Sequence, residues 1–202
     1  MGVDPTGARD FYAAVFGWEF RREGSRGYHL ILLGGEIVGG LGPSPAGPRF
    51  GSAWSVYLAA KDLDAAQLRA ERHGARVLAG GVPAGGNGRL SLAVDPVGAP
   101  FGLWQGAHDE GVVLVDEPGA LTGAALHTPR PGDSAAFYRE VCGAHPSTER
   151  ADVPRWVPSF GVRGTGAFGN RARAAGARSL APGLFADPWG AVFAVTEPSV
   201  AG

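Results

Sequence analysis

The chain has 202 residues, a formal net charge of −1 and a single cysteine. A near-neutral charge excludes the basic surface that nucleic acids and anionic membranes attract. One cysteine excludes an intramolecular disulfide and a cysteine-based zinc or iron–sulfur site, and no segment reaches the roughly 18 consecutive apolar residues of a membrane span. We expect a cytoplasmic protein with no nucleic-acid or membrane partner.

Glycine and proline are frequent, at 34 and 16 residues, but 45% of the chain is hydrophobic and five residues are tryptophan. That much apolar surface can offset the entropy of ordering the chain. The composition therefore predicts a folded core.

The N-terminal segment has the pattern of a short amphipathic helix. Asp4-Pro5 provides an N-cap followed by proline at the first helical position, and Phe11 and Val15 recur on one side. Gly17 is the expected end of this helix.

Two strand-forming regions and a second helix follow. Residues 28–33 and 36–41 predict a hairpin with a Gly-Gly turn, and Trp54–Ala59 is a further β-rich run. Asp62 is a candidate cap for a helix that ends at Gly74.

A tight turn and a second series of elements complete the chain. Asp95–Gly98 has the residues of a type I turn, and a strand is expected over Pro100–Gln105. Asp133 is the candidate cap of a later helix. The remaining predicted strands are Leu121–Thr128, Trp156–Gly161 and Ala191–Thr196.

Landmarks of the first half recur in order in the second half. The spacing between each pair is 126, then 102, then 92 positions, so the second half lacks about 24 residues in one place and about 10 in another. The matching segments are Asp10–Trp18 with Ala136–Ala144, Trp54 with Trp156, Gly74–Ala79 with Gly176–Ala181, and Asp95–Phe101 with Asp187–Phe193.

This recurrence predicts an α+β fold made of four strand–helix–three-strand repeats, with curved mixed sheets and helices outside. The opening strand of the first repeat is missing, and the 24-residue loss corresponds to about two strands with their turns. We expect a first domain at 1–107, a linker at 108–119 and a second, truncated domain at 120–202. Because missing strands expose sheet edges, we expect the halves to pack together or two chains to form a homodimer.

These motifs resemble the vicinal oxygen chelate superfamily, which includes glyoxalases, bleomycin-resistance proteins and extradiol dioxygenases. The resemblance rests on the segments Phe11–Trp18, Trp54–Ala59, Asp62–Ala66 and Asp95–Phe101 and covers nearly the whole chain. It is greatest for the four-repeat actinobacterial branch described as glyoxalase-like or hydroxylase. Members are metalloenzymes or simple binding proteins, so the family alone does not predict an activity.

The resemblance also implies where a family metal would be held, on the first and last strands of paired repeats. The matching positions here are Ser55, Gly102, Gly123, Val157 and Ala194. Divalent metals need several oxygen or nitrogen donors, which these residues do not supply. We therefore expect neither a metal nor another cofactor.

Aromatic residues suggest a different use for the first half. Tyr57 and Trp104 share the strand parity of Ser55 and Gly102, so we expect them to face the same cup. Such a lining suits a flat organic molecule. We predict that Tyr57, Trp104 and Ser55 bind a small aromatic ligand, with Tyr28 and Glu36 as weaker candidates.

Several functions remain open at this stage, and the sequence favours a metal-independent binding protein over an enzyme. A metal-dependent lyase or dioxygenase would need ligands from Glu36, His29 or His127. A metal-free enzyme would use His127 or Glu36 as its catalytic base. A further alternative is a partner subunit without a functional cup.

Overall fold

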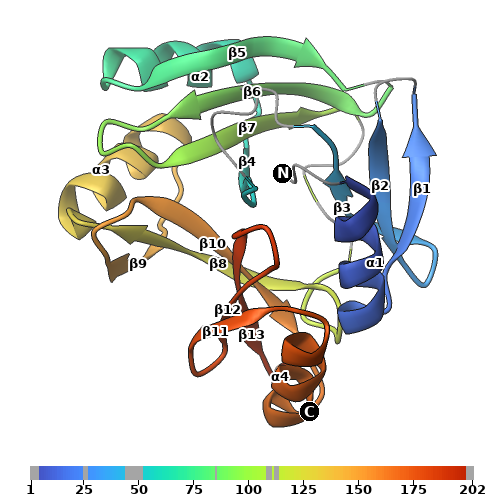
Figure 1. The fold of residues 1–202 in the computed structure, drawn as a ribbon. Coiled ribbons are helices and arrows are strands. Elements are labelled where there is room, and N and C mark those ends of the chain that lie inside the picture. Colours follow the sequence, from blue (N-terminus) through green and yellow to red (C-terminus); the bar gives the residue numbers. More distant parts are fainter. Residues whose placement is uncertain are drawn as a thin grey trace. The chain divides into compact units, whose positions relative to one another are not determined.

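The computed structural model describes residues 5–24, 27–43, 52–84, 86–107, 111 and 114–198 (Figure 1). The helices are α1 (Pro5–Phe16), α2 (Leu63–Arg72), α3 (Pro131–Cys142) and α4 (Thr165–Ala174). The strands are β1 (Glu19–Glu23), β2 (Tyr28–Leu33), β3 (Glu36–Leu41), β4 (Tyr57–Ala59), β5 (Arg76–Pro83), β6 (Gly88–Val94), β7 (Pro100–Gly106), β8 (Leu121–Thr128), β9 (Ser147–Arg150), β10 (Arg155–Gly161), β11 (Arg178–Ala181), β12 (Leu184–Ala186) and β13 (Val192–Thr196).

The chain forms two compact units, and each unit takes segments from both sequence halves. Unit 1 contains residues 1–54, 112–123 and 158–202, and unit 2 contains residues 55–111 and 124–157. This partition differs from the predicted division at 108–119. The strand ladders, however, stay within one half, in sheets of order β1-β2-β3, β4-β7-β6-β5 and β11-β12-β13-β10-β8-β9.

Unit 1 has its core between its two helices and the strands that they cover. Antiparallel pairing joins β1 to β2 and β2 to β3, while β13 pairs with β12 and, in parallel, with β10. Side chains of α1, including Phe11 and Val15, pack in one cluster with Ile31 of β2 and with Phe168 of α4. The apolar face of α1 is therefore buried as the sequence predicts.

Unit 2 is built in the same way around α2 and α3. Its four-stranded sheet has β4 parallel to β7, and the β5-β6-β7 segment antiparallel throughout. Leu63 of α2 and Phe101 and Leu103 of β7 pack in one cluster with Phe137 of α3. In this unit β8 pairs in parallel with β9.

The third repeat lacks two of the three strands that follow the helix in the second repeat, which matches the 24-residue difference in spacing. In the second repeat, β5, β6 and β7 follow α2, whereas only β9 lies between α3 and β10. Because β5 and β7 run in the same direction, excision of two consecutive strands leaves the remaining strand parallel to the opening strand. Accordingly, β9 pairs with β8 as β7 pairs with β4.

Most predicted helix and turn signals match the structure. Gly17 follows α1 with a φ of 75°, Asp62 caps α2 by accepting a hydrogen bond from Ala65 N at 2.9 Å, and Gly98 N donates to Asp95 O at 3.0 Å in the predicted turn. Asp4 lies outside the described residues. The mixed sheets and the helices packed on them confirm the α+β class.

The prediction that Asp133 caps α3 is wrong. The helix begins at Pro131, its N-cap is Arg130 and no side chain caps it. Proline at the first helical position fixes the N-cap at Arg130, three residues before Asp133, which places Asp133 inside the first turn.

Candidate functional site

The predicted ligand-binding residues of β4 and β7 lie on one face of the four-stranded sheet. In the parallel register, Tyr57 is opposite Gly102 and Ala59 is opposite Trp104. The intervening Leu103 is buried in the helix-side core. Because side chains alternate along strands, Tyr57 and Trp104 project from the face opposite α2.

We call this surface the aromatic face. Leu90 pairs with Trp104 and Leu92 with Gly102 across β6 and β7, so these leucines share it. Val82 of β5 pairs with Leu90 at its edge. The aromatic face thus consists of Tyr57, Val82, Leu90, Leu92 and Trp104.

The position of the Tyr57 ring requires a glycine at position 102, because any Cβ there would collide with the ring. Tyr57 is 41% exposed as a residue, and a Cβ added at Gly102 would collide with three carbons of its ring. The glycine therefore lets the ring lie against the β7 backbone with its outer surface available. An exposed aromatic ring beside a half-buried tryptophan can stack with a flat apolar molecule.

Ser55 is less well defined as a site residue. It is half-buried and lies just before β4, and the backbone pairing with β7 begins beside it, where Gly102 N donates to Val56 O at 2.9 Å. Its contribution to a ligand site stays a prediction.

Tyr28 and Glu36 belong to unit 1, whereas Tyr57 and Trp104 belong to unit 2. Tyr28 is exposed at the start of β2 and covers the glycine backbone at Gly40 and Gly42. Although the residue is 40% exposed, partial burial of its phenol and, second, the nearby Glu23 carboxylate raise the pKa of that group. Tyr28 thus covers a glycine strand in the same manner as Tyr57.

His127 lies in unit 2 on β8. Leu126 and Thr128 face the helix side, where the Thr128 hydroxyl is bonded to Ser134 at 2.9 Å, so His127 projects from the opposite face. Its cross-strand partner on β9 is Glu149. Partial burial and the Arg155 guanidinium lower the pKa of His127, and the Glu149 carboxylate opposes this effect.

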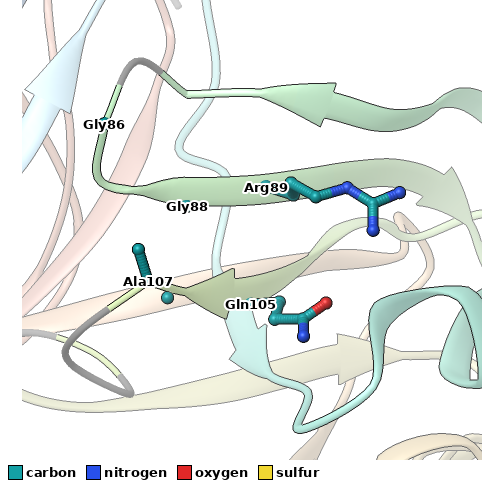
Figure 2. A pocket seen from close by; sticks show the side chains of 6 residues that line it. Gly86, Gly88, Arg89, Gln105 and Ala107 are labelled. Atoms are coloured by element: carbon teal, nitrogen blue, oxygen red, sulfur yellow. The ribbon is translucent and has the colours of Figure 1, made fainter.

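A hollow of about 310 Å³ lies beside the start of β6 and the end of β7 (Figure 2). Glycines form much of its wall, and Arg89 and Gln105 supply its long polar side chains. Arg89 makes two hydrogen bonds to Asp64, at 2.9 and 3.1 Å. Gln105 accepts from Leu63 N at 3.2 Å and donates to Lys61 O at 3.1 Å. These groups therefore hold the start of α2 in place.

Two buried Trp–Tyr–Asp triads were not predicted as functional groups. In unit 2, the Trp156 indole N–H donates to the Tyr138 hydroxyl at 3.0 Å. That hydroxyl donates to Asp95 Oδ2 at 3.1 Å. The other oxygen, Asp95 Oδ1, accepts from three backbone N–H groups of the following turn. The triad thus fastens α3 to the turn before β7.

The same triad recurs in unit 1. The Trp54 indole N–H donates to the Tyr12 hydroxyl at 3.1 Å, and the hydroxyl donates to Asp187 Oδ2 at 2.9 Å. Asp187 Oδ1 accepts from Trp189 N and Ala191 N. Burial, followed by the adjacent aspartate, raises the pKa of Tyr12. The three residue types recur in the sequence repeat, which is the signal that could have identified them.

The positions that the resemblance assigns to a metal do not fit one. Gly102, Gly123, Val157 and Ala194 have no donor side chain, and Ser55 offers a single hydroxyl. Across the described residues, no three or more histidine, cysteine, aspartate or glutamate side chains form a cluster that could hold an ion. None of the helices in the same ranges has the length and apolar character needed to cross a membrane.

Comparison with known proteins places the chain in a family. The model of the Glyoxalase/Bleomycin resistance protein/Dioxygenase superfamily matches residues 2–104. CFP32 of Mycobacterium tuberculosis (strain CDC 1551 / Oshkosh), named as a glyoxylase, is 32% identical over 239 aligned residues that include 98% of this chain and 92% of the relative. The chain therefore belongs to this superfamily, as the sequence motifs predict.

A second relative and two solved structures extend the comparison. The anthracycline biosynthesis protein DauV of Streptomyces sp. (strain C5) is 30% identical over 189 residues, with 82% of this chain and 69% of the relative covered. The Mn(II)-bound glyoxalase from Novosphingobium aromaticivorans has a TM-score of 0.66 at 19% identity, covering 96% of this chain and 78% of that one. A variant of homoprotocatechuate 2,3-dioxygenase from B. fuscum has a TM-score of 0.67 at 15% identity, covering 97% and 69%. At these identities the likeness shows the fold alone.

Proposed function

We propose that the protein binds a small planar aromatic molecule on the aromatic face without a metal ion. The observation that carries this proposal is the exposed ring of Tyr57, held against the Gly102 backbone beside Trp104. A ligand stacked there would bury apolar surface of both partners at little entropic cost, because the tyrosine ring is already positioned. The named role of DauV in anthracycline biosynthesis supports a fused aromatic ligand.

The chemistry of the candidate metal positions supports the metal-independent form of this proposal. Replacement of donor side chains by glycine and aliphatic residues leaves no ligand set for a Lewis-acid site. We therefore expect binding to persist after chelator treatment. Pairing of two chains and a cytoplasmic location stay predictions.

The test is a titration of the untagged protein with the anthracycline doxorubicin, followed by calorimetry. We expect Trp104→Leu and Tyr57→Leu each to weaken binding at least tenfold, since base- or ring-sized stacking contacts contribute about 1–3 kcal/mol. Leu68→Ala, at an exposed position on α2, is the matched control and should bind normally. Metal content is measured by elemental analysis before and after chelation.

Two outcomes would overturn the proposal. One is binding that survives both aromatic substitutions as well as it survives the control substitution. The other is a stoichiometric metal whose removal abolishes binding. In the latter case, ligands would have to be sought among Glu36, His29 and His127.

A metal-free acid–base reaction is the second candidate, and the environment of His127 favours it. A histidine with a lowered pKa is neutral at physiological pH and can accept a proton. Activity that resists chelation but is lost in His127→Gln would select this function over simple binding. Glu36 is exposed at the first residue of β3 in unit 1, and its role as a base stays a prediction.

A further inference from the structure

The four-stranded sheet of unit 2 contains only two charged residues. Its strands β4, β5, β6 and β7 have the sequences YLA, RVLAGGVP, GRLSLAV and PFGLWQG, so the two charges are those of Arg76 and Arg89 (Figure 1). Both are arginines, but they lie on opposite sides of the sheet.

Arg89 lies on the helix side, where its charge is neutralised. Its cross-strand partner is Gln105, two residues from the buried Leu103. Two nitrogens of the guanidinium donate to the Asp64 carboxylate of α2, at 2.9 and 3.1 Å. The charge of Arg89 is therefore paired with α2 and directed away from the aromatic face.

Arg76 lies on the other side of the sheet, at one end of the aromatic face. Its cross-strand partner is Val94, which has the strand parity of Leu90 and Leu92. The next residue, Val77, packs on the helix-side core, so Arg76 projects from the opposite side. Arg76 is exposed, and it forms no ion pair with another described residue. The aromatic face therefore has an unneutralised positive charge at its end.

The strand register gives the separation between this charge and the aromatic rings. Val94, the partner of Arg76, lies two residues from Leu92 on β6. Leu92 is in turn opposite Gly102, where the Tyr57 ring lies against the backbone. Arg76 is thus displaced by about 7 Å along the strands and, two strands away from β7, by about 10 Å across them. The long arginine side chain covers part of this separation, so fused rings stacked on Tyr57 would bring an outer-ring substituent to the guanidinium.

A carboxylate is the substituent that this arrangement favours. A guanidinium donates two parallel hydrogen bonds to a carboxylate, and one guanidinium matches a single negative charge. The attraction is stronger beside apolar side chains than in bulk water. A cationic substituent would be repelled, because the strands of this sheet contain no acidic residue.

We propose that the aromatic face binds a planar aromatic carboxylate, whose rings stack on Tyr57 and Trp104 and whose carboxylate pairs with Arg76. This inference rests on the proposed function and names the class of its ligand. All three residues belong to unit 2.

The probes are two anthraquinones that differ in charge, anthraquinone-2-carboxylate and the uncharged anthraquinone-2-carboxamide. Each is titrated into the full-length protein at low salt and followed by tryptophan fluorescence and calorimetry. We expect the carboxylate to bind about threefold more tightly than the carboxamide, which is the effect of one partly exposed ion pair. This preference should decrease as the salt concentration rises, because exposed charges are screened.

Arg76→Gln tests the assigned partner of the carboxylate. The substitution is at an exposed position, and we expect it to abolish the preference for the carboxylate. Arg72→Gln is the matched control, since it removes the same charge from the last turn of α2 on the helix side. The Arg72→Gln protein should keep the preference.

Equal affinities for the two probes, or a preference that survives Arg76→Gln, would overturn this inference. Trp104→Leu distinguishes that failure from a failure of the proposed function. If it weakens both probes about tenfold while the unsubstituted protein binds them equally, only the role of Arg76 is wrong. If it weakens neither probe, the proposed function is wrong as well. Absence of binding by both probes would also overturn the inference, and the doxorubicin titration would then decide the proposed function by itself.

Discussion

Tyr138 is completely buried, and its hydroxyl both donates to Asp95 and accepts from Trp156. Tyr138→Phe would leave the aspartate oxygen and the indole N–H without this partner. We expect the free energy of unfolding to fall by about 1–3 kcal/mol, measured by urea denaturation.

The repeated triad provides the comparison for this substitution. Tyr12→Phe should cause a loss of similar size, because the same two bonds are removed in unit 1. Val153→Ala, at an exposed position, should have little effect. A Tyr138→Phe protein as stable as the Val153→Ala protein would show that the triad does not stabilise the fold.

The raised pKa values of the two buried phenols also predict that the free energy of unfolding falls at alkaline pH. Burial raises the pKa of Tyr12 and Tyr138 above the ordinary value of 10.0. Because the folded state holds these protons more tightly, their stabilisation is complete below pH 10 and is lost as the pH rises above it. Each tyrosine should then contribute about 1.4 kcal/mol of lost stability per pH unit.

Denaturation measured between pH 9 and 11 would show this slope, and tyrosinate absorbance would follow the unfolding. In Tyr138→Phe, the loss of unfolding free energy per pH unit should be smaller by the contribution of one tyrosine, about 1.4 kcal/mol. An unchanged slope would mean that this phenol ionises as readily in the folded protein as in the unfolded chain.

The lowered pKa of His127 predicts a loss of stability at acidic pH. Its pKa is lowered from 6.5 mainly by burial and then by Arg155, so the neutral ring is favoured in the folded state. Its contribution to stability is present above pH 6.5 and is lost as the pH falls through the lowered folded-state pKa. NMR titration should give a pKa below 6.5 that rises in Arg155→Gln and falls further in Glu149→Gln.

Residue-level roles were predictable from sequence only where local geometry decides them. Strand parity correctly places Tyr57 and Gly102 opposite each other. The partners of Tyr138 are not local, since Asp95 lies in the other half of the chain. Recurrence of Tyr, Trp and Asp marks these positions as equivalent, but it does not state which of them meet.

At the scale of single elements, the starts of α2 and α3 can be compared directly. Asp62 caps α2 through Ala65 N, so Asp62→Ala should lower the free energy of unfolding by about 1 kcal/mol. Asp133 is inside the first turn of α3 and has only an exposed ion pair with Arg130 at 3.7 Å.

Asp133→Ala should therefore cost only a few tenths of a kcal/mol. Thermal and urea denaturation of both variants would measure the difference. Equal losses in the two variants would indicate that Asp133 does contribute a cap in solution.

Long apolar elements were predictable, while short polar ones were not. The hairpin of β2 and β3 and the strand β8 have the predicted bounds. In contrast, β1, β9 and β11 are short strands with mainly exposed side chains. Because no buried face imposes an alternating pattern on them, only their neighbours in the sheet define them as strands.

The whole molecule depends on both sequence halves, since each compact unit contains segments of each. A fragment of residues 1–107 would lack α3 and α4, and with them Phe137 and Phe168 of the two cores. We expect this fragment to be unfolded by circular dichroism. Coexpression with residues 108–202 should restore a folded complex, whereas a cooperatively folded isolated fragment would contradict the expectation.

The two strands that the third repeat lacks have a consequence for how chains of this architecture can vary in length. Removal of one strand would reverse the direction of every strand after it in the antiparallel segment, but removal of two preserves that direction. Folded chains of this architecture should therefore differ in length by pairs of strands, and one such pair here corresponds to about 24 residues. Insertion of the β6–β7 segment after β9 should accordingly lengthen the sheet while leaving the course of the following chain unchanged.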